Sequence, residues 1–153
     1  PRVSMPTFAE LMMQTDGAGR NWSYLAGEEN FRKIKDLQKR NLVVPLVGDF
    51  AGPKAIRAVG QYLRDHGAAV TTIYASNVEQ YLFQQGDNWK KYYSTLAGLP
   101  LDSSSTFIRS VTSLPPACPK CVTVTLVCSV ADLVNAFLAG HIGSYAGVIQ
   151  MSK

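Results

Sequence analysis

The chain has 153 residues, of which 46% are hydrophobic and 17% charged, with a net charge of +4 and a pI of about 9.1. This composition excludes a disordered chain, and no apolar run reaches the roughly 18 residues that cross a bilayer. The basic residues are scattered and not interleaved with aromatic side chains, which disfavours a nucleic-acid partner. The sequence therefore predicts one globular domain.

Two helices are predicted in the first part of the chain. Thr7 precedes a short apolar helix as its cap, and a second helix covers residues 28–40. Its apolar residues recur at every third position: Phe31, Ile34 and Leu37. We interpret residues 1–41 as an N-terminal helical segment and residues 42–153 as part of an α/β domain.

The remaining chain alternates predicted strands with predicted helices. Stretches rich in β-branched residues predict four strands: 42–47, 70–75, 106–111 and 122–127. Helices are predicted over residues 53–66, 77–83, 88–96 and 130–139. The two steps from a strand to a helix to the next strand predict parallel pairing through right-handed crossovers. Pro45 lies inside the first strand, so we expect a bulge or an edge position there.

The turn from Gly48 to Lys54 is the first candidate site. Ligands bind beyond the carboxyl ends of the strands in open parallel sheets, and this turn follows the first predicted strand. Its glycines allow close approach of a ligand to the backbone, and the N-terminus of the next helix favours negative charge. It is not a Walker loop, because Ala55 stands where a Ser or Thr would bind magnesium. The alternative interpretation is a tight turn in which Asp49 is a cap.

Two further polar stretches are candidates. Asn77 and Glu79 follow the second predicted strand, and Arg109 lies beyond the polar turn at residues 102–105. Ser76 and Glu79 also have the spacing of a capping box, so a structural role is the alternative for Glu79. Polar turn residues are usually only turn residues, and this is the alternative for the third stretch.

The three cysteines are Cys118, Cys121 and Cys128. Cys118 and Cys121 have the spacing of a zinc knuckle or a redox pair, but a structural zinc needs four ligands. We interpret all three as free thiols in a reducing compartment and predict no metal site. The N-terminus has no secretory pattern, so we expect a cytoplasmic location.

Four strings carry a resemblance to a known family: Asn41–Gly60, Ser76–Leu82, Leu99–Ser110 and the ending Ser144–Lys153. They resemble an uncharacterised bacterial family with a class I methyltransferase-like fold, and the similarity extends over nearly the whole chain. The resemblance implies a Rossmann-like α/β fold, with a mostly parallel sheet flanked by helices. It also implies that the chain is the C-terminal half of the domain, incomplete at its N-terminus.

The resemblance further implies a function. In proteins of that fold, a glycine-rich loop and an acidic residue after the first two strands hold S-adenosylmethionine, and neither is found in this chain. We predict the C-terminal portion of an S-adenosylmethionine-dependent methyltransferase-like protein, with Asp49 as the catalytic residue. The residues expected at the cofactor are Gly48, Asp49, Phe50, Gly52 and Lys54. The residues expected at the substrate are Asn77, Glu79 and Arg109.

The alternative function is a non-catalytic ligand-binding or protein-binding module on the same fold, because a fold does not determine a function. The expected partners are a small-molecule ligand and the N-terminal half of the same natural chain, and neither a membrane nor nucleic acid is expected. We also expect self-association, because half a sheet would leave an exposed edge strand.

Overall fold

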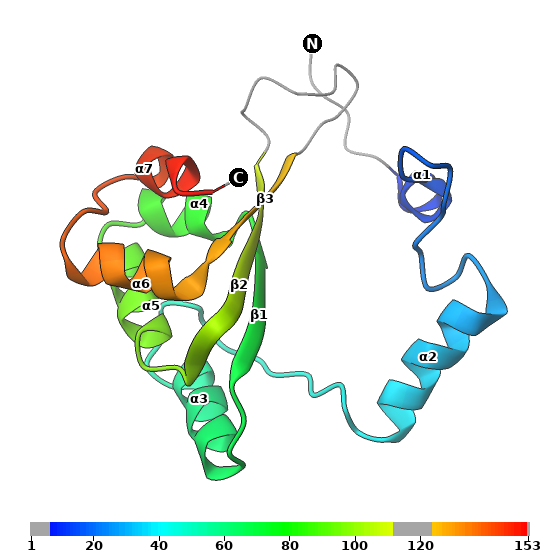
Figure 1. Cartoon of the computed structure of the whole chain (residues 1–153), viewed down its shortest axis with the longest axis horizontal. Helices are drawn as coiled ribbons and strands as arrows, with labels where there is room; N and C mark the ends of the chain where they lie inside the picture. Colours follow the sequence, from blue (N-terminus) through cyan, green and yellow to red (C-terminus); the bar gives the residue numbers. More distant parts are fainter. Residues whose placement is uncertain (1–6, 112–123, 153) are drawn as a thin grey trace. The chain divides into compact units, whose positions relative to one another are not determined.

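The computed structural model of the chain describes residues 7–111 and 124–152, which belong to two compact units, Pro1–Leu46 and Val47–Lys153 (Figure 1). The first unit contains α1 (Phe8–Met13) and α2 (Glu28–Lys39). The helices of the second unit are α3 (Ala55–Asp65), α4 (Val78–Gln84), α5 (Asn88–Leu96), α6 (Val130–Leu138) and α7 (Tyr145–Gln150). Its strands are β1 (Val70–Ser76), β2 (Leu101–Val111) and β3 (Val124–Ser129).

Local interactions define the two helices of the first unit, and both predictions are confirmed. The Thr7 hydroxyl accepts a hydrogen bond from the Glu10 amide at 3.2 Å, and the Glu10 carboxylate accepts one from the Thr7 amide at 2.7 Å. This capping box satisfies two amides that the first turn of α1 leaves unpaired. In α2, i,i+4 ion pairs join Glu28 to Arg32 and Glu29 to Lys33. Neither helix buries a residue.

The second unit is built on a mixed three-stranded sheet in the order β1-β2-β3. β1 and β2 are parallel, as predicted, whereas β3 pairs with β2 in the antiparallel direction. The register aligns Tyr74, Ile108 and Val127 in one row across the sheet. Figure 1 shows the helices of this unit gathered on one face of the sheet.

The predicted Rossmann-like sheet is wrong. Residues 42–47 form no strand, and their side chains are exposed, from 50% at Val43 to 104% at Val47. A strand of this apolar kind needs a paired neighbour and cover on both faces, and Pro45 removes one donor that pairing would use. The mixed direction of β3 also departs from the prediction. A parallel return needs a crossover, usually helical, and residues 112–123 contain three prolines.

The core lies between the sheet and its helices. Alternate residues of β2 point into it, and all four are buried: Ser105, Phe107, Arg109 and Val111. The helices contribute the other large buried side chains: Tyr92, Tyr93, Leu96, Val130, Leu133 and Val148. The opposite face of the sheet is open in this unit, where Tyr74 is 66% exposed. The sheet and the helices therefore enclose four buried polar or charged residues within a mainly apolar layer: Glu79, Thr95, Ser105 and Arg109.

The predicted helices of the second unit are confirmed, and one helix was not predicted. α3, α4, α5 and α6 lie within two residues of their expected bounds. α7 is short and contains Gly147, which weakens its helical signal. The Ser144 hydroxyl caps it by accepting from the Gly147 amide at 3.2 Å. Across the described residues, no helix combines the length and apolarity that a bilayer span requires.

Candidate functional site

The turn before α3 is a compact structure fixed by its own backbone. The Asp49 carboxylate accepts from the Ala51 amide at 2.9 Å, and the Gly52 amide donates to the Asp49 carbonyl at 3.0 Å. A Cβ atom at Gly48 would lie 2.3 Å from the Cβ of Ala55, so only glycine fits there. Ala51 is buried in the core and anchors the turn. The tight-turn interpretation is therefore confirmed, but Asp49 is not the cap of α3, because Lys54 is its N-cap residue and no side chain caps that helix.

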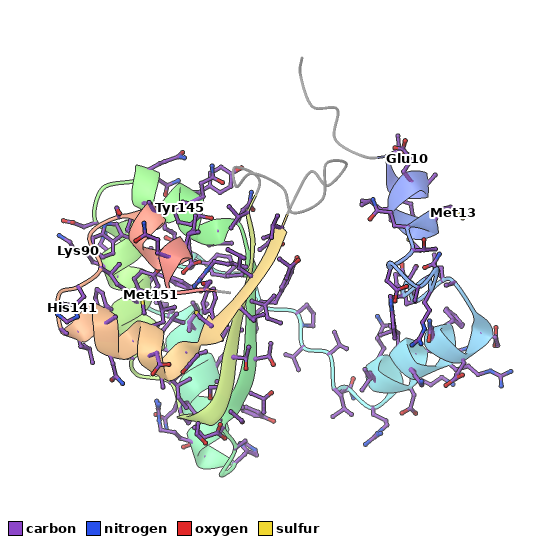
Figure 2. All side chains as sticks on the ribbon, turned by 45° about the horizontal axis from the view of Figure 1, so that its top comes forward. Glu10, Met13, Lys90, His141, Tyr145 and Met151 are labelled. Carbon is purple, nitrogen blue, oxygen red and sulfur yellow. The ribbon has the colours of Figure 1, made fainter. Side chains whose placement is uncertain are left out.

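An open cavity of about 640 Å³ lies between this turn and the beginning of α5. Its walls mix apolar groups with polar groups of both charge types: Asp49, Ala51, Gly52, Pro53, Arg57, Asp87, Asn88, Lys90, Lys91, Ser94 and Thr95. Lys90 lies on the outer side of the helical layer and pairs with Asp87 at 2.7 Å (Figure 2). The Lys91 ammonium donates to the Asn88 side-chain oxygen at 3.2 Å. The cavity therefore has a rigid turn on one side and a helix N-terminus on the other.

Only part of the predicted cofactor site lines this cavity. Asp49 and Gly52 do, but Gly48, Phe50 and Lys54 do not. The Phe50 ring packs edge-on against Tyr92, with ring centroids 6.1 Å apart. Lys54 is the N-cap residue of α3 and is exposed. The structure therefore brings two of the five predicted residues to one cavity.

Two of the predicted substrate residues form a buried ion pair. Arg109 and Glu79 have exposed fractions of 0% and 1%. Arg109 donates from Nε to Glu79 Oε2 at 2.6 Å and from Nη2 to Oε1 at 3.2 Å. Such a two-pronged pair is the strongest arrangement of these groups. The third predicted residue, Asn77, is half-buried at the N-terminus of α4, and its side chain makes no cap hydrogen bond.

Further partners complete this buried cluster. The Tyr93 hydroxyl donates to Glu79 Oε1 at 2.6 Å, while Arg109 Nη1 donates to the Ser152 hydroxyl and, at 3.4 Å, to the Val148 carbonyl. Burial, and then the charge of Glu79, raise the pKa of Tyr93 above its ordinary value. Burial alone would lower the pKa of Arg109, but Glu79 outweighs it, so that this pKa is also raised. The cluster joins α4, α5, β2 and α7, and the charges of Glu79 and Arg109 are paired with each other.

Sequence reasoning missed the pairing and several cavity residues. One signal in the sequence could have indicated the pair. Arg109 lies two residues after Phe107, and therefore on the same buried face of the strand, and a buried charge needs a partner. The capping-box interpretation of Glu79 is wrong, because Asn77, and not Ser76, is the N-cap residue and makes no side-chain cap bond. Glu79 turns inward instead. Arg57 and Lys91 lacked any motif and are found only through the packing of their helices.

Cys118 and Cys121 lie outside the described residues. Cys128 is a free thiol that accepts from Arg109 Nη1 at 3.5 Å. In residues 7–111 and 124–152, no group of three or more His, Cys, Asp or Glu side chains could hold a metal ion. His66 stacks on Tyr62 and contacts its carbonyl at 2.8 Å, in keeping with a role at the end of α3.

One protein family matches the chain. The family model described as "Domain of unknown function (DUF7790)" matches residues 5–127, which are 123 of the 153 residues. The matched span includes the whole cavity at Asp49 and both Glu79 and Arg109. It ends before α6 and α7, whose region supplies Val148 and Ser152 to Arg109. No curated protein matches the chain.

Proposed function

The chain belongs to the family described as Domain of unknown function (DUF7790), and on this premise we propose that its second unit binds a small polar molecule. The ligand occupies the cavity between the Asp49 turn and α5. That cavity is the observation that carries the proposal, since its volume of about 640 Å³ falls within the range of small-molecule sites.

The cavity offers polar groups that do not serve the fold. One oxygen of the Asp49 carboxylate holds the turn, whereas its second oxygen has no partner among the described residues. Ser94 is exposed on α5 and lines the cavity. A rigid wall carrying a few available donors and acceptors is typical of a binding site. Glu79 and Arg109 bind each other inside the core, so they take no part in this proposal.

Methyl transfer from S-adenosylmethionine is the second proposal, and the position of Asp49 favours it. A carboxylate with one oxygen available at a cavity can orient or deprotonate a nucleophile. The described residues form a mixed three-stranded sheet and not the mostly parallel sheet that the family resemblance implies, so the fold lends this proposal no support. It rests on Asp49 alone.

A thermal-shift titration of the whole chain with a panel of small polar metabolites tests the first proposal. Binding to the folded state at a hundredfold excess over Kd adds about 2.7 kcal/mol, which raises Tm by several degrees. Ser94→Trp places a large ring in the cavity and should abolish the shift. Ser103→Trp, an exposed serine outside the cavity, is the matched control and should retain it. A folded protein that no compound shifts would favour a protein-binding module instead.

S-adenosylhomocysteine belongs in the same panel because it tests the second proposal separately. A saturable shift that Ser94→Trp removes would support methyl transfer, and Asp49→Asn should then abolish transfer while keeping the shift. No shift at millimolar S-adenosylhomocysteine, with another compound bound, would remove methyl transfer and leave the binding module in place.

A further inference from the structure

The cavity at Asp49 continues into a second hollow along α3. This hollow, of about 550 Å³, shares Arg57, Ser94 and Thr95 with the first. Its remaining walls come from α3 and from the end of α5: Ala58, Gln61, Arg64, Gly98 and Leu99. The two hollows together form one groove, called here the α3–α5 groove.

α3 packs closely against the residues that follow α5, beside the groove. Gly60 is buried, and a Cβ atom there would lie 2.9 Å from Leu99 Cδ2. Arg64 Nη1 donates to the Gly98 carbonyl at 2.6 Å, and its Nη2 donates to the Gln61 side-chain oxygen at 3.2 Å. These contacts fix Arg64 and Gln61 in place along one wall, so the groove is a built feature of the unit.

The groove carries an excess of positive charge. Four cationic side chains line it against two carboxylates, those of Asp49 and Asp87. Lys90 already pairs with Asp87, which leaves Arg57, Arg64 and Lys91 against the one carboxylate of Asp49, and Arg64 donates to the Gly98 carbonyl. The excess therefore centres on Arg57, which lines both hollows and has no hydrogen-bond or ion-pair partner among the described residues, and on neighbouring Lys91.

Neutral polar side chains line the groove beside Arg57 and beyond it. Gln61 and Ser94 are neutral and polar, and both are exposed. From Arg57 to Arg64 the helix rises about 10 Å, since each residue adds about 1.5 Å. The Arg57 end therefore suits a compact anion, and the stretch between Arg57 and Arg64, whose guanidinium is bound to the Gly98 carbonyl, suits hydroxyl groups on a chain or ring of a few carbons.

We propose that the ligand of the α3–α5 groove is a phosphate ester of a small polyhydroxy compound. Its phosphate binds Arg57 and Lys91, and its hydroxyl groups lie along Gln61 and Ser94. A guanidinium is well matched to phosphate because its planar fork donates to two oxygens at once. This inference rests on the proposed binding function and specifies the chemical class of the ligand.

An NMR titration of the ¹⁵N-labelled whole chain tests the inference with three probes: ribose 5-phosphate, ribose and inorganic phosphate. Ribose 5-phosphate should saturate and shift the amides of Arg57, Gln61, Lys91 and Ser94. Inorganic phosphate should shift Arg57 and Lys91 with lower affinity, and ribose alone should bind at least tenfold more weakly than its phosphate. Raising the salt concentration should weaken binding of both anions, because the groups are exposed.

Variants separate a specific site from general charge attraction. Arg57→Gln should weaken ribose 5-phosphate binding by about tenfold or more, the expected loss of a hydrogen-bonded charge contact. Lys91→Gln should act in the same direction. Arg32→Gln removes the same charge from an exposed residue in the first unit and should leave Kd unchanged.

Three outcomes would overturn the inference. Equal weakening by Arg57→Gln and Arg32→Gln would show attraction to net charge only. Ribose binding as tightly as ribose 5-phosphate at the same amides would remove the phosphate and leave the proposed binding function standing. No shift at these amides with any of the three probes would also overturn it, and the metabolite panel with Ser94→Trp then decides the proposed function on its own.

Discussion

Removing Arg109 should destabilise the second unit far more than removing an exposed cation. The substitution Arg109→Met leaves the Glu79 carboxylate buried, with the Tyr93 hydroxyl as its remaining hydrogen-bond partner in the described cluster. Breaking a buried ion pair in this way costs about 3–5 kcal/mol. Domains of this size unfold at about 5–15 kcal/mol, so the loss is a large fraction of the total.

The assay is urea unfolding followed by tryptophan fluorescence. Trp89 stacks on Phe83 with ring centroids 4.7 Å apart, so its emission reports the packing of the helical layer. The titration is made in a Trp22→Phe background, because the chain has two tryptophans. With a slope of about 1–3 kcal/mol per molar urea, the midpoint should fall by at least about 1 M.

Two variants decide whether the charge pair is the cause. Lys90→Met breaks the exposed pair with Asp87, whose side chains are 55% and 69% exposed, and should cost less than about 1 kcal/mol. Adding Glu79→Gln to Arg109→Met removes the stranded charge and keeps an acceptor for Tyr93, so it should recover stability. A urea midpoint for Arg109→Met no lower than that of Lys90→Met would show that the buried pair contributes no more than the exposed one. A double variant less stable than Arg109→Met would show that the stranded charge of Glu79 is not the cause of the loss.

Three further predictions concern the same unit. Tyr93→Phe should destabilise the unit by about 1.5–3 kcal/mol, because it removes a hydrogen bond to a charged group. Tyr145→Phe should be neutral or stabilising in the same urea titration, because the buried Tyr145 hydroxyl has no hydrogen-bond partner among the described residues. Burial raises the pKa of Tyr92 and Tyr93 in the folded state above the value of about 10 in the unfolded chain. Their contribution to the unfolding free energy is therefore complete below about pH 10 and is lost as the pH rises above it. Unfolding free energy should accordingly fall above about pH 10, and tyrosinate absorbance from both rings should appear only with unfolding. Gly48→Ala should cost about 1–3 kcal/mol through its clash with Ala55, while Gly143→Ala, with open space around its Cβ position, should not; equal melting points of these two variants would contradict the packing of the turn.

Helices were predicted well because their signals are local. The cap at Thr7, the paired acidic residues before Phe31 and the glycine after His66 each act within one turn of helix. Caps and apolar periodicity can be read from neighbouring residues in the chain. The same logic explains why α7 was missed, since it is short and contains Gly147.

Strands and sites depend on distant parts of the chain. Residues 42–47 have the apolar composition of a covered strand, but composition does not supply a neighbour to pair with, and the run forms no strand and is exposed. β2 is longer than predicted because residues 101–105 pair or pack beside β1, where Ser105 donates to the Val70 carbonyl at 2.6 Å. Neither the pairing with β1 nor the bond from Ser105 to Val70 can be predicted from neighbouring residues in the sequence.

The candidate site residues also divide into those placed by local sequence and those placed by contacts with distant parts of the chain. Asp49 and Gly52 were predicted from a turn motif and do line a cavity. Glu79 and Arg109 were selected for their charge, yet they meet across thirty positions of sequence and bind each other. A charged residue in a strand indicates that some partner exists, but the identity of the partner follows only from the packing of α4 on the sheet.

Hydrogen exchange with and without the compound that gives the largest thermal shift tests the central claim most directly, namely that the ligand site is the α3–α5 groove and not the Glu79–Arg109 cluster. The compound should slow exchange in residues 49–64 and 88–98 and leave exchange in residues 78–84 and 107–111 unchanged. Protection centred on 78–84 and 107–111, with residues 49–64 unchanged, would contradict it and would return Glu79 and Arg109 to the ligand.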